Sequence, residues 1–189
     1  MRHAASPLLA TMTHIGVSMQ FVEDGCVPPT ALPEYVRGVR GIMAHHEFPC
    51  VIFGHAGDAN VHVNPLVDIT KPGWRERVGA ALDEVVALTI VLGGTLAGEH
   101  GDGRLRTPFM DRVWANDALV LFELVKHCFD PRGILNPGVK IALPGQMPLP
   151  AIKYDPELPP LTPAARTALD LVSDTRAYGR FRLELVSGR

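Results

Sequence analysis

The sequence predicts an α+β fold, in which an antiparallel sheet has helices packed on one face. Three observations support this expectation. Residues 60–64 (NVHVN) alternate strictly between apolar and polar side chains, as a strand with two unlike faces does. Residues 74–92 repeat apolar side chains with the helical period. Strands and helices also alternate without the regular βαβ rhythm of a parallel sheet.

The N-terminal part of the chain is expected to supply one strand, one helix and a second strand. Residues 14–24 show the modest alternation of a strand, and residues 27–29 (VPP) form a turn. Thr30 can cap a helix that runs to about His46, with its apolar residues at the helical period. Residues 49–54 (PCVIFG) then form a short buried strand.

The middle of the chain continues with the alternating strand and two further helices. In the strand at 60–64 the two valines face one way, and three polar side chains face the other, namely Asn60, His62 and Asn64. The helix at 74–92 ends at the glycine pair 93–94, and a short strand follows at 95–97. A last helix covers about 117–129 and stops at Asp130-Pro131, with Cys128 expected in the core.

The character of the chain changes after residue 142. We therefore divide it into a domain at 1–142 and a proline-rich arm and tail at 143–189. The tail is expected to hold a weak amphipathic helix at about 163–177 and a short strand at about 180–186.

Composition and charge exclude several classes of protein. Lys plus Arg number 18 and Asp plus Glu number 20, so the net charge of −2 argues against nucleic-acid binding. No apolar run is long enough to span a membrane. The first residues do not continue into a clean secretory signal. The three widely spaced cysteines favour a reducing cytoplasmic setting, with an electron-transfer partner as the route to any peripheral contact with the inner membrane.

Two glycine-framed motifs carry the chemistry. Residues 54–64 read GHAGDANVHVN and place His55 on a loop and His62 on the polar face of the following strand. Residues 98–104 read GEHGDGR and add the carboxylate of Glu99 and the imidazole of His100. Two histidines and one carboxylate with open coordination positions are typical of a catalytic metal site, for which zinc is the leading candidate.

The residue types and spacings alone leave a second interpretation open. A single histidine is more often a hydrogen-bonded surface or core residue than a metal ligand. Asp58 and Asp102 are expected to form turns or to support the site rather than to bind the metal. Arg104 and Arg106 are expected to be solvated charges, with an anionic substrate as the alternative partner.

Three motifs in order resemble a known family. They are GHAGDANVH, GEHGDGR and DPRGILNPG at 130–138, and RHAASP at 2–7 and EDGCVPPTALPEYV at 23–36 extend the match to about residues 2–141. The chain resembles the C-terminal domain of FAD-linked oxidases of the vanillyl-alcohol-oxidase type, in particular the D-lactate, glycolate and D-2-hydroxyglutarate dehydrogenases. The sequences EDGCVP and GEHGDGRLR are most similar to those of large bacterial members in which the flavin module is fused to an iron–sulfur module.

The resemblance implies roles for individual residues. His55, His62 and Glu99 match metal ligands, and His100 matches the histidine beside the flavin, which would act as the base. The remaining matches are to substrate contacts and to a flavin-side position: Arg2, Ser6 and Asn64 for the substrate, and Asn136 of the NPG motif for the cofactor. The implied reaction oxidises a 2-hydroxy acid by removal of its hydroxyl proton and transfer of its α-hydride to flavin.

The chain also departs from the family pattern. Residues 18–24 contain no lysine where some relatives have one, which argues against a dicarboxylate substrate. The domain that binds FAD in the family, about two hundred residues long, is not found in this sequence, and three scattered cysteines cannot hold an iron–sulfur cluster. We therefore expect a fragment or a split gene product that holds half of an active site and needs an FAD-binding domain supplied elsewhere. The other readings are a metal-dependent hydrolase and a docking module without catalysis.

Overall fold

The structure is a computed structural model that describes residues 15–149 and 156–175. The chain divides into two compact units, Met1–Tyr154 and Asp155–Arg189, and the second contains α7 (Pro163–Thr175). The described elements of the first unit are β1 (Val17–Ser18), β2 (Gly25–Cys26), η2 (Pro29–Ala31), α2 (Leu32–His45), β3 (Cys50–His55), η3 (Ala56–Asp58), β4 (Asn60–Val67), α3 (Trp74–Val91), α4 (Gly103–Arg106), η4 (Thr107–Phe109), α5 (Met110–Val113) and α6 (Asn116–Phe129).

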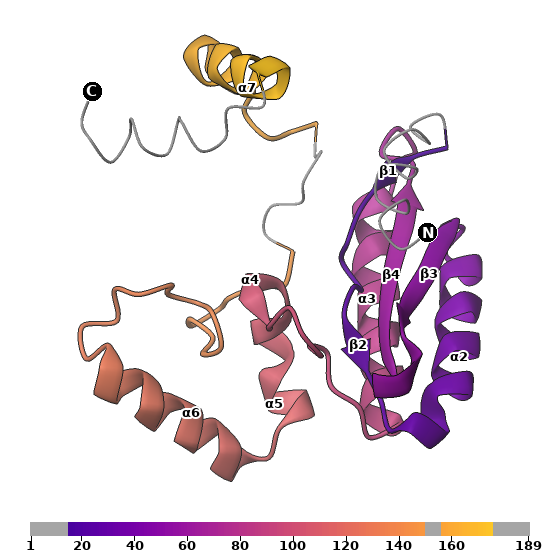
Figure 1. The fold of residues 1–189 in the computed structure, drawn as a ribbon, viewed down its shortest axis with the longest axis vertical. Coiled ribbons are helices and arrows are strands. Elements are labelled where there is room, and N and C mark those ends of the chain that lie inside the picture. Colours follow the sequence, from indigo (N-terminus) through magenta and orange to yellow (C-terminus); the bar gives the residue numbers. More distant parts are fainter. Residues whose placement is uncertain (1–14, 150–155, 176–189) are drawn as a thin grey trace. The chain divides into compact units, whose positions relative to one another are not determined.

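The sheet is built around β4, which pairs antiparallel with every other strand. Along one edge it pairs with β3, from Cys50 opposite Pro65 to His55 opposite Asn60. Along the other edge it pairs with β1 near its end and with β2 near its start. Figure 1 shows α2 and α3 running alongside the β3–β4 hairpin. The predicted α+β class with an antiparallel sheet is confirmed.

The core lies between the sheet and the two long helices. The valines of β4 at positions 61, 63 and 67 are buried in it, as their alternation predicts. Both helices contribute one apolar face at the helical period. The buried side chains on these faces include Tyr35, Val39 and Met43 from α2, and Val78, Leu82, Val85 and Val86 from α3. Because the helices cover the face with these valines, the opposite face of the sheet points away from them.

The predicted strand at 14–24 is wrong over most of its length. The structure keeps only β1, and the chain then leaves the sheet until β2 begins at Gly25. Asp24 has φ of 79°, in the left-handed region that breaks an extended strand. The predicted strand at 95–97 is reduced to a single bridge between Thr95 and Cys26. These interruptions free two loops, 19–24 and 93–101, to fold over the sheet.

The apolar face predicted for the last helix is not a core face. In the part of the chain that the structure describes, nothing buries Leu121, Leu124 or Val125, and Cys128 is exposed, so its predicted core position is wrong. The helix α6 packs instead through Phe122, whose ring meets Trp114 edge to face at 5.5 Å. Among the described helices, none combines the length and apolar character that a bilayer crossing requires.

The remaining elements lie close to their predicted bounds. α7 matches the helix predicted at 163–177, and the strand predicted at 180–186 lies outside the described residues. The boundary predicted after residue 142 stays a prediction.

Candidate metal and acid–base site

The site lies on the sheet face that points away from the helices. Residues two apart on a strand share a face, and pairing of Phe53 with His62 and of His55 with Asn60 places His55 diagonally across from His62. The turn η3 joins the two strands, as the glycine-framed motif predicts. The two imidazole rings meet edge to face with centroids 5.4 Å apart. His62 is buried, and His55 is partly exposed at the end of its strand.

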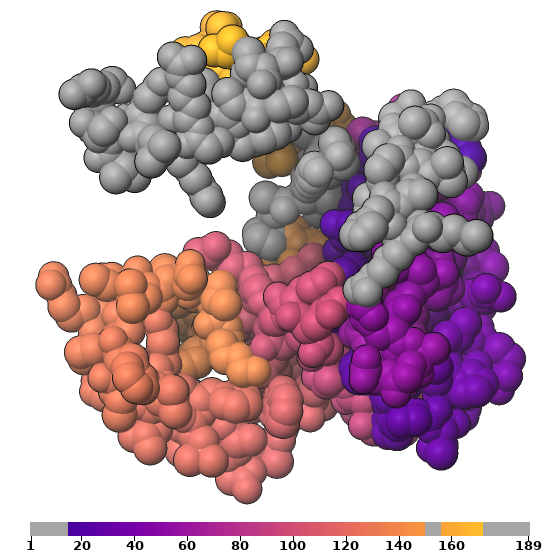
Figure 2. Space-filling model, in the orientation of Figure 1, coloured from indigo at the N-terminus to yellow at the C-terminus, as the bar shows by residue number. Residues whose placement is uncertain are grey.

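The loop at 98–101 brings Glu99 and His100 to the same face. Gly98 is required there, because a Cβ at this position would lie 2.2 Å from Nδ2 of Asn60. The loop is fixed by the buried carboxylate of Asp24, which accepts the backbone N–H of Glu99 at 3.0 Å and of His100 at 2.7 Å. In the space-filling view the segment around residues 100–110 (pink) adjoins the β3–β4 region (purple) (Figure 2).

Three imidazole nitrogens converge on one oxygen of Glu99. Its Oε1 lies 2.9 Å from Nε2 of His62, 3.2 Å from Nε2 of His55 and 3.3 Å from Nε2 of His100. Donor atoms around a tetrahedral metal, with bonds of about 2.1 Å, are roughly 3.4 Å apart. The donor atoms of His55, His62 and Glu99 all lie within 4.8 Å of one another, so small movements can surround an ion.

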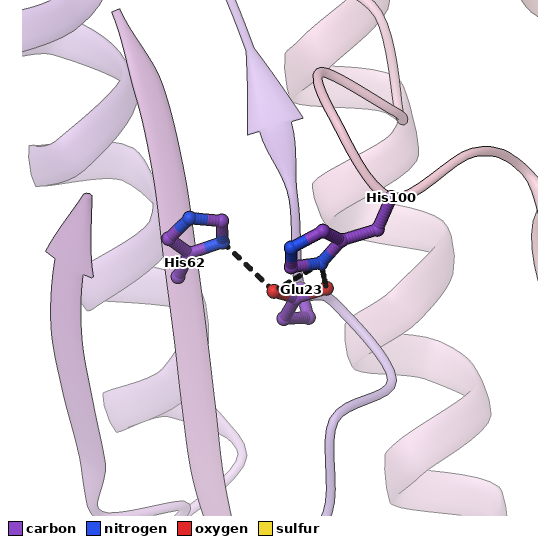
Figure 3. A group of neighbouring side chains, drawn as sticks. All are labelled: Glu23, His62 and His100. Carbon is purple, nitrogen blue, oxygen red and sulfur yellow. Dashed lines mark hydrogen bonds and ion pairs between the residues drawn. The ribbon is translucent and has the colours of Figure 1, made fainter. Parts of the chain in front are cut away.

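Glu23 connects the buried His62 with the exposed His100 (Figure 3). Its carboxylate lies 2.8 Å from Nδ1 of His62 and 2.9 Å from Nδ1 of His100. The rings of these two histidines are stacked with centroids 5.1 Å apart. A carboxylate on the outer nitrogen of an imidazole is the usual arrangement behind a metal-binding histidine, because it orients the ring and raises its basicity.

Arg106 holds Glu23 in place from the other side. Its guanidinium donates to the backbone carbonyl and the carboxylate of Glu23, and to the carbonyl of Gly101 at 2.7 Å. The Arg106 side chain is 12% exposed and engaged within the protein, so its expected position as a solvated charge is wrong. Its contacts with Glu23 and Gly101 also argue against the alternative in which it clamps an anionic substrate. Asp102 pairs with Lys140 at 2.9 Å, which is consistent with the expected supporting role.

The surroundings change the pKa of one histidine and of one carboxyl group in the site. The hydrogen bond that Glu23 accepts from His100, aided by the nearby carboxylates, raises the pKa of His100 above its ordinary value. Burial alone would raise the pKa of Asp24, but the N–H of His100, the Asn60 amide, the N–H of Glu99 and the Arg106 charge together hold that pKa below its usual range.

The residues present fit a divalent metal. The contact between His62 Nδ1 and Glu23 has a poor direction for a hydrogen bond, so this nitrogen is a buried polar atom without a hydrogen-bond partner among the described residues. Such an atom needs a partner. A metal on Nε2 would orient the ring so that Nδ1 can donate to Glu23. His55, His62 and Glu99 would hold the ion, and the nearby acidic groups would balance its charge.

The structure places the other predicted site residues less centrally. Asn64 is buried on the same face of β4 and accepts a hydrogen bond of 3.0 Å from the Gln20 side chain. Asn136 lies in the loop after α6 with φ of 44°, and its predicted contact with a flavin stays a prediction. Arg2 and Ser6 lie outside the described residues.

The sequence analysis did not assign Glu23, Asp24 or Arg106 to the candidate site in the positions that the structure gives them. The EDG motif at 23–25 and the arginine two residues after GEHGDGR were visible in the sequence. Their roles depend on contacts between residues 75 to 83 positions apart, which neither periodicity nor local spacing can reveal.

Comparison with known proteins adds a family to this geometry. The family model described as FAD linked oxidases, C-terminal domain, matches residues 1–139. The chain is 36% identical over 121 residues to the glycolate oxidase subunit GlcD of Bacillus subtilis, a match that covers 64% of the chain and 26% of that protein. It is 35% identical over 155 residues to the D-2-hydroxyglutarate dehydrogenase of Escherichia coli (82% of the chain, 15% of that protein). It is 33% identical over 129 residues to the D-lactate dehydrogenase of Archaeoglobus fulgidus (67% and 28%).

Proposed function

This chain belongs to the C-terminal domain family of FAD linked oxidases, and from that membership we propose that it is the substrate- and metal-binding part of an FAD-dependent 2-hydroxy-acid dehydrogenase. The matched region makes up between 15% and 28% of three of its relatives, so the activity of a whole enzyme is part of this proposal. Those relatives are named for glycolate, D-2-hydroxyglutarate and D-lactate, which share a hydroxyl group next to a carboxylate.

The convergence of three imidazole nitrogens on Glu99 carries the proposal. We assign His55, His62 and Glu99 as ligands of one divalent metal, with zinc as the leading candidate. The bound metal would supply a Lewis acid that lowers the pKa of the substrate hydroxyl. The three carboxylates of Glu23, Asp24 and Glu99 outnumber the guanidinium of Arg106, which pairs with Glu23, and this excess of negative charge suits a cation.

His100 is the proposed base. Its Nε2 faces the metal-binding group at 3.3 Å from Glu99, while its Nδ1 is held by Glu23. Because Glu23 holds Nδ1, Nε2 is the ring nitrogen that would receive the hydroxyl proton, and Glu23 would stabilise the resulting imidazolium. FAD, bound mainly by a domain outside this chain and approached by His100 and Asn136, would supply the acceptor for the hydride.

The substrate carboxylate is assigned to Asn64 and to the N-terminal residues Arg2 and Ser6. Asn64 lies two positions beyond His62 on the same strand, so it faces the same side of the sheet as the ligand. Gln20 covers it from the segment that contains no lysine. A monocarboxylate of the lactate or glycolate type fits this side-chain set better than a dicarboxylate, because the set offers no additional cation.

The proposed partners follow from the family. We expect an FAD-binding domain, on a further segment or on a separate chain, to complete the enzyme and an iron–sulfur module to receive its electrons. Free thiols at all three cysteines are consistent with a cytoplasmic location, with the iron–sulfur partner as the route to any contact with the inner membrane.

The test uses the full chain loaded with Co²⁺, whose visible spectrum reports the ligands of the ion. Glycolate and D-lactate should change this spectrum, and propionate, which lacks the hydroxyl group, should change it far less. The His55→Ala chain should bind no Co²⁺ at this site. An equal response to propionate and D-lactate would contradict the proposal, and metal-dependent ester cleavage by the chain would favour the hydrolase alternative.

A further inference from the structure

A second group of metal-ligating side chains lies away from the site described above. His45 is the last residue of α2, His46 follows it, and Glu84 lies on the neighbouring helix α3. The ligand atoms of these three side chains all lie within 4.8 Å of one another. His46 precedes β3 and His55 ends that strand, so the two groups flank opposite ends of β3.

The group is held in place by contacts that do not use all of its donor atoms. Nε2 of His46 lies 2.8 Å from Oε1 of Glu84. The ring of His46 is stacked against Phe48 at 6.2 Å, and this contact with a buried side chain fixes its orientation. The ring of His45 meets that of His46 edge to face with centroids 4.9 Å apart. Two imidazoles therefore face one carboxylate across the contact between α2 and α3.

The surroundings favour a cation at this position. The C-terminal end of a helix carries partial negative charge on its last carbonyl groups, and His45 and His46 lie at that end of α2. The nearest acidic neighbour in sequence, Glu47, is already neutralised by Lys71 and Arg77, at 3.7 Å and 3.3 Å. Those two basic side chains are therefore committed to Glu47 rather than to Glu84.

The burial of the three residues suits an ion that is reached from solvent. His46 is 8% exposed, whereas His45 and Glu84 are exposed. An entering ion would meet His45 and Glu84 at the surface and the preoriented His46 beneath them. Two imidazoles and one carboxylate form the donor set that binds zinc and similar divalent ions, with water completing the coordination.

We propose that His45, His46 and Glu84 form a second divalent-metal site, of the zinc class, that clamps the C-terminal end of α2 to α3. This site is independent of the proposed catalytic metal. It would stabilise the packing of the two helices that form the core with the sheet, because a ligand that binds only the folded state shifts the folding equilibrium.

The test measures zinc stoichiometry in the full chain after metal removal by a chelator and dialysis. The wild-type chain should bind two equivalents of zinc. His45→Gln and Glu84→Gln should each bind one, since both residues are exposed and their replacement leaves the core intact. His127→Gln is the matched control: it changes another exposed histidine in the last turn of a helix, and it should keep both equivalents.

The outcomes separate this proposal from the proposed function. His55→Gln should lose the other equivalent, and the His45→Gln/His55→Gln chain should bind none. A wild-type chain with one equivalent that is lost only in His55→Gln would overturn the second site and leave the first standing. Two equivalents that are unaffected by both His45→Gln and Glu84→Gln would also overturn it. Loss of zinc in His45→Gln but not in His55→Gln would support the second site and contradict the first.

Discussion

Replacement of Asp24 by asparagine tests whether one buried carboxylate organises the site. Asparagine has nearly the same shape and tolerates the left-handed backbone conformation at φ of 79°, so the substitution changes mainly charge and hydrogen bonding. In the wild type, Oδ1 accepts from the Asn60 amide at 2.9 Å and from the N–H of Glu99 at 3.0 Å. Oδ2 accepts from the N–H of His100 at 2.7 Å.

The expected orientation of the new amide follows from an unused acceptor. Oδ1 of Asn60 is a buried atom without a hydrogen-bond partner among the described residues. In Asp24→Asn the new carbonyl oxygen should keep the N–H groups of Glu99 and His100. Its NH₂ group should then meet the Asn60 amide, which can rotate to present its oxygen. The number of unpaired buried atoms therefore need not rise.

The cost is the difference between charged and neutral acceptors. A hydrogen bond to a charged group contributes roughly 1.5–3 kcal/mol and a neutral one roughly 0.5–1.5 kcal/mol. Two backbone N–H groups keep an acceptor but lose its charge, so the free energy of unfolding should fall by about 2 kcal/mol. Asp24→Ala should lower the free energy of unfolding by at least about 2 kcal/mol more than Asp24→Asn does. Alanine leaves the buried donors unpaired, and it is less favourable than asparagine in the left-handed region of backbone conformation.

The assay is urea unfolding of the chelator-treated chain, followed by tryptophan fluorescence, to which the buried Trp74 and the exposed Trp114 both contribute. Asp83→Asn is the matched control, because Asp83 forms only an exposed ion pair with Arg112 and should contribute less than about 1 kcal/mol. The reasoning is refuted if Asp24→Asn is no more destabilising than Asp83→Asn, or if Asp24→Ala costs no more than Asp24→Asn.

Four further predictions concern the site, the cofactor and the loop after α6. In an enzyme completed with an FAD-binding domain, His100→Ala should lower kcat by roughly 10²-fold and keep the metal, whereas His55→Ala should lose the metal by elemental analysis; metal loss in His100→Ala would make His100 a ligand. Glu23→Gln should shift the acidic limb of the pH profile of kcat/KM to lower pH, because the carboxylate that raises the pKa of His100 is gone. An unchanged pH profile would exclude this positioning role of Glu23. The chain alone should not bind FAD stoichiometrically, and a flavin absorption spectrum after purification would contradict this. The hydrogen bond from Lys126 lowers the pKa of Asp130, so the loop after α6 should be ordered at pH values above the ordinary pKa of a carboxyl group and should loosen as the pH falls through the lowered pKa. Faster amide exchange in this loop at low pH should show the loosening, and Asp130→Asn should abolish this pH dependence.

The sequence predicts regular elements well where one periodicity runs without interruption. The helix at 74–92 and the strand at 49–54 differ from α3 and β3 by one residue at most at either end. The strand at 60–64 extends to Val67 in the structure, because β3 pairs with β4 up to Pro65 and β1 pairs with Leu66 and Val67 beyond it. In each case local side-chain pattern and tertiary packing agree.

Two predictions fail because tertiary contacts override the local pattern. The residues at 14–24 alternate like a strand, yet the conformation of Asp24 and its hydrogen bonds to the loop at 98–101 remove most of them from the sheet. The apolar residues of α6 repeat with the helical period, but in the described part of the chain they remain exposed. Periodicity identifies an apolar face, and only the fold decides whether that face is covered.

The candidate site shows the same division between local and distant information. The glycine-framed motifs were sufficient to predict that His55, His62 and Glu99 could meet, because each motif places its ligand on a turn or a polar strand face. The residue that holds the Glu99 loop in place could not be predicted in this way, because Asp24 lies 75 positions away from Glu99 in the sequence. In the sequence this aspartate looks like any other, and its role appears only in the fold, where three donors surround its carboxylate.

The polar face of β4 explains why these hidden residues matter. Its alternation would ordinarily point Asn60, His62 and Asn64 toward water, yet every residue of β4 is buried. Burial of polar side chains is unfavourable unless polar groups meet them. Those groups come from the segment that left the sheet: Asp24 accepts from Asn60, the carboxylate of Glu23 lies 2.8 Å from His62, and Gln20 donates to Asn64. All three belong to the interrupted edge at 19–24. The failed strand prediction and the candidate site therefore have one physical origin, since a continuous strand at 14–24 could not fold its carboxylates over the face of β4.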